Sequence, residues 1–198
     1  IGPALGVWTQ GLFADTDDAM RIVQVREWMA GKPWFDFSVA RMSPPEGFRT
    51  HWSHVVDLPV AGLIKLFGLA LDPMQAERAA RIAFPGLCFV ALLAALVALG
   101  RRLLGPQGGL AAAGLAPFAY FAMQFRAGRV DHHAPQLTLL AALAYALIRS
   151  LDPGAARWAA AAGGAAALSL AISVENLPFL AAAAGFYAIL AAAAPARA

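Results

Sequence analysis

The stretch IAFPGLCFVALLAALVALG, residues 82–100, contains no Asp, Glu, Lys or Arg, and it decides the class of fold. Residues 103–125 and 176–196 are equally free of these side chains, and residues 132–148 and 158–174 are shorter but mostly apolar. A transmembrane helix needs about 20 mainly apolar residues. The pattern therefore predicts an all-α fold, a polytopic membrane helix bundle with five transmembrane helices at about 80–101, 109–126, 133–150, 157–174 and 177–196.

The overall composition points the same way. Of the 198 residues, 60% are hydrophobic and 14% are charged, whereas a soluble domain averages about 25% charged residues. This balance excludes a soluble enzyme, a disordered tail and a fibrous repeat. The formal net charge is +3, but the arginines lie between apolar segments, where they orient a membrane protein. We therefore expect the lipid bilayer as a partner and no nucleic acid.

Most charged side chains lie in residues 14–81, ahead of the long apolar segments. Within this part, apolar residues recur at helical spacing from Asp18 to Ala30, and Gly31 and Pro33 end the predicted helix. Residues 34–54 carry turn signals and predict an ordered loop, and residues 58–71 predict an interfacial helix or the foot of the next membrane helix. We treat residues 1–198 as a single membrane domain whose large first external loop is 14–81. Because the chain starts abruptly in an apolar segment and stops without a clear end, we expect truncation at both ends.

The charges in the short loops predict an orientation. One set of loops has a net charge of +4, from Arg101, Arg102, Arg149, Asp152, Arg157 and Arg197. The other set sums to zero, from Arg126, Arg129, Asp131 and Glu175. Positively charged short loops stay in the cytoplasm, so we expect the first set on the cytoplasmic side. We also expect the chain to be an integral protein of a bacterial inner membrane. The polar loop 14–81, residues 126–133 and Glu175 then face the periplasm or outside.

Two acidic stretches on that face are candidates for chemistry. Asp15, Asp17 and Asp18 either cap a helix or form a site that binds a divalent metal or orients an acceptor, since hard oxygen ligands suit Mg²⁺ or Mn²⁺. Asp131, His132 and His133 either cap the next helix or hold a cation, for which imidazole favours Mn²⁺ over Mg²⁺.

Further polar residues allow both structural and functional interpretations. Arg126 and Arg129 are suited to clamp a phosphate or pyrophosphate, or they extend to the membrane interface. Glu175 either caps the following helix or borders the polar cavity. His51, Trp52 and His54 offer a catalytic histidine or a second metal ligand, or else loop packing and interfacial anchoring.

These motifs resemble the GT-C glycosyltransferases, and most closely the catalytic subunit of oligosaccharyltransferases. Asp17 is followed by the run Arg26-Glu27-Trp28-Met29-Ala30-Gly31, which is similar to the first external loop of that family, as is Trp34-Phe35-Asp36. The resemblance implies that Asp17, or else Asp15, is the catalytic metal ligand that also positions the acceptor. Asp131 and His133 correspond to the second-loop ligand pair. Ser173-Val174-Glu175 is similar to a later family motif but comes several helices too early.

The resemblance also implies an activity. It is an inverting, metal-assisted transfer of a sugar or oligosaccharide from a polyprenyl-phosphate or polyprenyl-pyrophosphate donor to an unknown acceptor on the non-cytoplasmic side. Trp34, His51, Trp52 and His54 are candidates for acceptor or loop contacts. The alternatives are a polytopic transporter, which would place acidic groups deep within its spans, and a non-catalytic membrane assembly protein.

Overall fold

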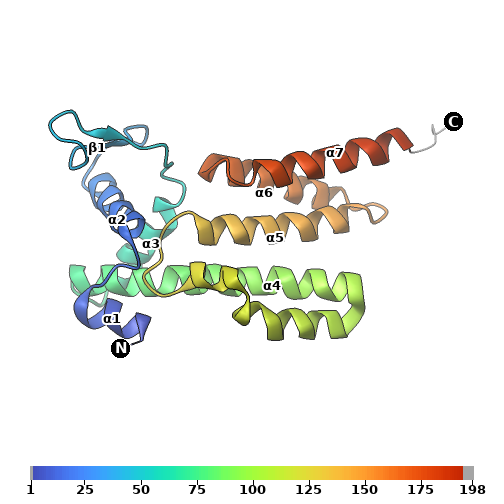
Figure 1. The fold of residues 1–198 in the computed structure, drawn as a ribbon, viewed down its shortest axis with the longest axis horizontal. Helices are drawn as coiled ribbons and strands as arrows, with labels where there is room; N and C mark the ends of the chain where they lie inside the picture. Colours follow the sequence, from blue (N-terminus) through green and yellow to red (C-terminus); the bar gives the residue numbers. More distant parts are fainter. Residues whose placement is uncertain (1, 194–198) are drawn as a thin grey trace.

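The computed structural model describes residues 2–193 and consists almost entirely of helices (Figure 1). In chain order the elements are α1 (Pro3–Gln10), α2 (Thr16–Met29), β1 (Ser38–Val39), β2 (Phe48–Arg49), α3 (Asp57–Phe67), α4 (Pro73–Leu115), the 3₁₀ helices η1 (Ala116–Phe118) and η2 (Tyr120–Phe125), α5 (His133–Ser150), α6 (Ala156–Ile172) and α7 (Leu177–Ala193). The predicted all-α class is confirmed. The predicted end of the last helix at 196, and Arg197, lie outside the described residues.

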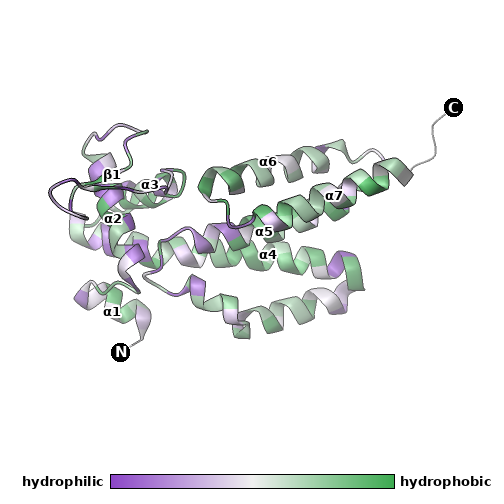
Figure 2. Ribbon diagram, turned by 45° about the horizontal axis from the view of Figure 1, so that its top comes forward, coloured by the Kyte–Doolittle hydropathy of each residue, from purple (hydrophilic) through white to green (hydrophobic). Residues whose placement is uncertain are grey.

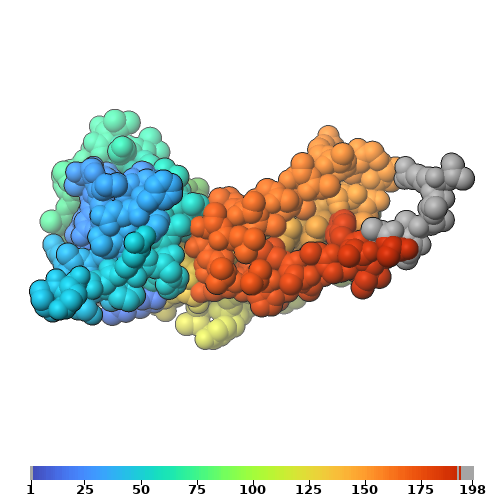
Figure 3. All heavy atoms as spheres, turned by 90° about the horizontal axis from the view of Figure 1, so that it is seen from above, coloured from blue at the N-terminus to red at the C-terminus, as the bar shows by residue number. Residues whose placement is uncertain are grey.

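The helices are arranged as a bundle with a polar lobe at one end. Helices α4 to α7 run lengthwise beside one another, while α1, α2, α3 and the β1–β2 hairpin gather at one end of them (Figure 1). Seen from above, this N-terminal lobe abuts the end of α6 and α7 (Figure 3). Hydrophobic residues dominate α4 to α7, whereas hydrophilic residues are concentrated in the lobe and the connecting loops (Figure 2).

An apolar core joins the lobe to the bundle. Ile22 and Val25 of α2, Val60 of α3 and Phe84 of α4 are buried together with Val130 and Ile172 from the segments near α5 and α6. Arg26 of α2 also pairs with Glu77 of α4 at 2.6 Å. Two further apolar clusters hold α4 against α5 and α5 against α6. The lobe is therefore packed on the bundle, which fixes the position of its loops.

Helix α4 turns back on itself at Gly105, whose φ of 71° is open mainly to glycine. The turn lies in the predicted connection between 101 and 109. The second predicted helix, 109–126, differs from the structure because α4 ends at Leu115 and short 3₁₀ turns follow. Pro117, just after this end, has no N–H to donate to an α-helical partner, although α4 also contains Pro85 without ending there. Helices α5 and α6 begin and end close to the predicted ranges, and α7 begins at the predicted residue, Leu177.

Within residues 2–193, one helical segment is long and apolar enough to cross a membrane, namely residues 73–118 of α4 and η1. Helix α6 is apolar but has 17 residues, and the described part of α7 is apolar and also has 17 residues. Five membrane crossings therefore stay a prediction.

Candidate functional site

The polar residues singled out from the sequence meet at the lobe end of the bundle. Three segments contribute there: the start of α2, the connection 126–133 that leads into α5, and the turn 173–176 between α6 and α7. Each begins or ends a helix, so its backbone N–H and C=O groups need partners outside the helix. The side chains of the site supply many of them.

The start of α2 is a capping box. Asp15 Oδ1 accepts hydrogen bonds from the backbone N–H groups of Asp17 and Asp18, at 3.0 and 3.1 Å. The Asp15 N–H in turn donates to Asp18 Oδ2 at 3.2 Å. The helix-capping interpretation of these aspartates is thus correct for Asp15 and Asp18.

Asp18 also connects the two acidic stretches. Its Oδ1 accepts the backbone N–H groups of Val130, at 2.7 Å, and of Asp131, at 3.2 Å. The side chain is fully buried, and this burial raises the pKa of Asp18 to about 6. The charges of Asp131 and Asp15 add to the increase, while the Val130 hydrogen bond and Arg129 oppose it.

Arg129 forms a clamp between the same two stretches. Its guanidinium pairs with Asp15 on one side and with Asp131 on the other, and it donates to Gln124 Oε1 at 2.7 Å. A guanidinium offers five donors in a planar fork, which suits two carboxylates at once. The guanidinium of Arg129 is therefore occupied by partners within the protein, and a phosphate-binding role for Arg126 or Arg129 stays a prediction.

Asp131 is buried and contacts both Arg129 and His133. Burial alone would raise its pKa, but the adjacent His133 imidazole and the Arg129 guanidinium outweigh this and hold the pKa below the usual value. Its Oδ1 accepts the His133 backbone N–H at 3.0 Å, and its Oδ2 lies 3.0 Å from His133 Nδ1. Asp131 is therefore ionised and fixes the orientation of the first residue of α5.

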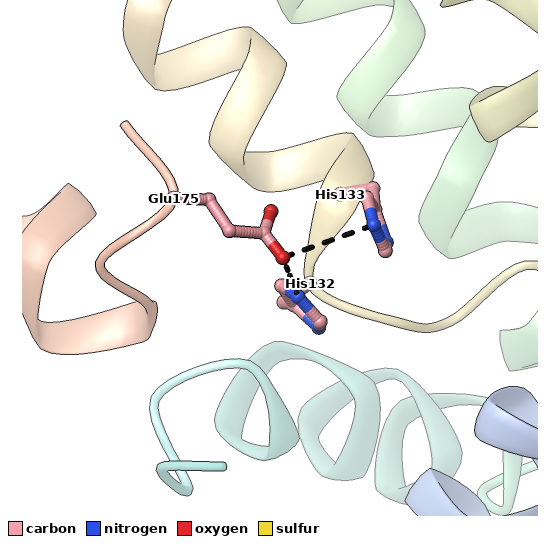
Figure 4. Close-up of side chains that lie close together, drawn as sticks. All are labelled: His132, His133 and Glu175. Atoms are coloured by element: carbon pink, nitrogen blue, oxygen red, sulfur yellow. Dashed lines mark hydrogen bonds and ion pairs between the residues drawn. The ribbon is translucent and has the colours of Figure 1, made fainter. Parts of the chain in front are cut away.

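His132, His133 and Glu175 form a second cluster beside Asp131. The two imidazole rings stack with centroids 4.4 Å apart. Glu175 Oε1 lies 2.8 Å from His132 Nε2 and 3.9 Å from His133 Nε2, and Figure 4 shows the carboxylate directed at both rings. One ligand atom from each of the three residues lies within 4.8 Å of the others.

A buried amide network holds Glu175 in place. Asn176 Nδ2 donates to the Gln136 backbone oxygen at 3.0 Å and to Gln136 Oε1 at 2.6 Å. Gln136 Nε2 donates to the carbonyl oxygens of Ser169 and Ser173, both at 3.0 Å. These bonds tie the α6–α7 turn to α5. Sequence reasoning missed Gln136 and Asn176, although one amide inside an apolar helix was a visible signal.

The candidate loop residues differ in their accessibility. His54 is fully buried: its Nδ1 lies 2.5 Å from Asp57 Oδ2, and its ring packs against Trp28, Trp34 and Phe37. Trp52 is buried too, yet its ring centroid lies 5.7 Å from that of His132. His51 is exposed. The structure thus uses His54 and Trp34 in packing and brings Trp52 against the site.

Arg126 and Asp17 lie on different surfaces. The exposed Arg126 borders a hollow of about 280 Å³ together with Phe13, Ala14 and residues of α1. Among residues 2–193, no carboxylate lies within ion-pair distance of Arg126. Asp17 is exposed and borders another hollow, with Val39, Arg41 and Met42. The structure therefore brings Asp15 and Asp18, rather than Asp17, to Asp131.

Fold and site together define a membrane protein with a charged centre at one end of its helix bundle. A family model described as dolichyl-phosphate-mannose-protein mannosyltransferase matches residues 59–196, more than two thirds of the chain, and the chain belongs to this family. It is a membrane glycosyltransferase of the GT-C type, which uses lipid-linked sugar donors. No curated protein and no solved structure matched. Asp131, His133 and Glu175 lie inside the matched range, and Asp15 lies before it.

Proposed function

We propose that the protein transfers a single sugar, of which mannose is the first candidate, from a polyprenyl-phosphate donor to an acceptor on the periplasmic face of a bacterial inner membrane. The observation that carries the proposal is the meeting of Asp15 and Asp131 on Arg129, although more than a hundred residues separate them. The family's description supplies the mannose and the single phosphate.

Asp15 is the carboxylate best placed to receive the acceptor. Its Oδ1 is occupied by the N–H groups of α2, whereas its side chain stays partly exposed beside Arg129. In an inverting transfer, the acceptor's nucleophilic atom attacks the anomeric carbon as the bond from that carbon to the phosphate oxygen breaks. The acceptor proton passes to Asp15, acting as general base, and polyprenyl phosphate leaves.

Arg126 is the proposed contact for the donor phosphate. It is exposed, and Ala14 on the rim of the same hollow is the neighbour of Asp15 in the chain. A charge-assisted contact from an arginine to a phosphate suits both the binding of the donor and the departure of the phosphate. Phosphate and acceptor would then meet between α1 and the start of α2.

An apolar groove next to the site supports a lipid-linked donor. It measures about 520 Å³ and lies between α3, α4, α5 and α6, with Leu63, Phe84, Leu139 and Ile172 in its walls. Pro135 also lines it, two residues after His133. A polyprenyl chain is apolar throughout and gains free energy from burial in such a groove.

The charge distribution supports the proposed side of the membrane. Arg102 pairs with Asp152 at 2.6 Å near the turn of α4, at the end of the bundle away from the lobe. Because positively charged short loops remain cytoplasmic, the charges of this end support a site on the outer side of the membrane. Labelling a cysteine at Glu46 with an impermeant maleimide, in a Cys88→Ser background and in right-side-out vesicles, tests this orientation; protection of the cysteine would contradict it.

The activity is tested by comparing two donors and two arginine variants. Membranes that contain the full chain receive polyprenyl-phosphate mannose or a polyprenyl-pyrophosphate oligosaccharide, and the released lipid phosphate is measured by mass spectrometry. We expect turnover of the monophosphate donor. Arg126→Gln should raise KM about tenfold or more, because a charge-assisted contact contributes roughly 1.5–3 kcal/mol. Arg41→Gln, an exposed arginine of the same lobe, is the matched control.

Other outcomes would separate the alternatives. Turnover of the pyrophosphate donor alone would favour an oligosaccharyltransferase-like reaction. Uptake of substrate into vesicles without a glycosylated product would favour a transporter and contradict the proposal. Equal KM values for Arg126→Gln and Arg41→Gln would remove Arg126 from the donor site.

A further inference from the structure

The geometry points to a transition-metal site formed by His132, His133 and Glu175, separate from the Asp15–Arg129–Asp131 cluster. We infer that one divalent cation binds between the two imidazoles and the carboxylate. The binding itself does not depend on the proposed function; only the role of the ion, given below, rests on it.

The first argument is the convergence of ligand atoms. Three ligand atoms, one from each residue, lie within 4.8 Å of one another, a spacing that a single ion can bridge with small side-chain movements. Both Nε2 atoms face the same carboxylate oxygen of Glu175 (Figure 4). The residues come from two segments that the Asn176–Gln136 bonds hold together, so the arrangement belongs to the fold rather than to one mobile loop.

The second argument is how the histidines are supported. His133 Nδ1 lies 3.0 Å from Asp131 Oδ2 without forming a hydrogen bond, so a small rotation of the ring would make the contact by which a carboxylate orients a metal-binding imidazole. His132 is more than nine-tenths buried, and its Nδ1 has no hydrogen-bond partner among residues 2–193. Because Nε2 is the nitrogen of His132 that is directed at Glu175, an ion would bind there, and the burial of the ring holds it in that orientation.

The third argument concerns the competing carboxylates. Asp15 and Asp131 are neutralised by Arg129, and a cation between them would have to displace a guanidinium that both already contact. Among residues 2–193, no arginine lies within ion-pair distance of Glu175, whose side chain is 47% exposed. Its exposure leaves coordination positions open to oxygen ligands from solvent or from a phosphate.

The donor set indicates which ions fit. Two imidazoles and one carboxylate suit Mn²⁺ or Zn²⁺ better than Mg²⁺, which prefers oxygen ligands and keeps its waters. When bound, the ion would supply positive charge that attracts oxygen ligands of a substrate to the Glu175 side of the site. The chain's own residues would hold the ion, with Asp131 keeping His133 in orientation.

The test measures Mn²⁺ binding to the full chain in detergent, without donor, by electron paramagnetic resonance. We expect one ion per chain, with an echo modulation from imidazole ¹⁴N. Glu175→Gln and His133→Gln should each weaken binding about tenfold or more. Both side chains are partly exposed, so thermal unfolding without metal should match the wild type. Glu46→Gln, on an exposed loop, is the matched control and should bind normally.

Unchanged binding in Glu175→Gln and His133→Gln would overturn the site, as would the absence of bound Mn²⁺ or of a nitrogen signal. Loss of binding in Asp15→Asn with retention in Glu175→Gln would overturn it as well, by moving the ion to the arginine-bound cluster. Donor turnover in excess chelator is assayed in parallel. Turnover without any Mn²⁺ binding would support the proposed function and refute the metal site. Mn²⁺ binding without turnover would support the metal site and contradict the proposed function.

Discussion

At the scale of single residues, helical phase explains which aspartates face the site. Asp18 lies four and seven positions before Ile22 and Val25, both fully buried, so all three share the inner face of α2. Asp17 is one residue out of phase and faces outward. The apolar pattern that predicted the helix contained this information. It could not show that Asp15 would turn back as the N-cap and meet Arg129, because the partner lies 114 residues away.

Asp18 should make stability depend on pH. Its folded pKa of about 6 exceeds the ordinary value of 3.8, so folding favours the protonated acid. Its contribution is complete below pH 3.8 and is lost as pH rises through 6, by at most about 3 kcal/mol in the free energy of unfolding. When melting temperatures are measured from pH 4 to 7, the melting temperature of Asp18→Asn should therefore rise relative to that of the wild type as the pH increases.

The exposed Asp17→Asn variant is the control for this measurement and should follow the wild-type pH profile. A constant difference between Asp18→Asn and the wild type across the range would show that the carboxyl titrates at its ordinary pKa.

At the scale of elements, the apolar segments of the sequence predicted a helix correctly where the helix extends over the whole segment. Helices α5, α6 and α7 illustrate this, since proline, glycine or polar residues mark most of their ends. The second arm of α4 shows the limit. The sequence of this arm is equally apolar, but a hydropathy pattern does not show that Pro117 lacks the backbone N–H that an α-helix needs. The 34–54 loop has no periodicity, so nothing in its sequence showed that His54 would be buried against Asp57.

The return of α4 depends on a close contact between glycines. A Cβ on Gly100 would lie 2.5 Å from the backbone oxygen of Gly108, in the opposite arm. Gly100→Ala should therefore destabilise the protein by about 1–3 kcal/mol and lower its melting temperature. Gly163→Ala in α6 is the matched control, since nothing lies within 4 Å of its added methyl group. Equal melting temperatures of the two variants would show that the arms are not in contact as described.

At the scale of the whole molecule, the alternation of loops between the two ends of the bundle predicted that the polar segments would meet. The start of α2, residues 126–133 and the turn 173–176 do lie at one end, together with the lobe. The order of helices was sufficient for this, because each pair of apolar segments returns the chain to the same end. The atomic pairing depends on hydrogen bonds such as that of Asp18 with Val130, which no spacing reveals.

The most direct test of the account compares kcat for Asp15→Asn and Asp17→Asn with the lipid-linked donor. Asparagine caps helices as well as aspartate does, so both variants should fold and should melt near the wild-type temperature. We predict that Asp15→Asn loses about 10²–10⁴-fold in kcat, as expected for removal of a general base, while Asp17→Asn stays near the wild type. The reverse order, or full activity in Asp15→Asn, would contradict the assignment of the site.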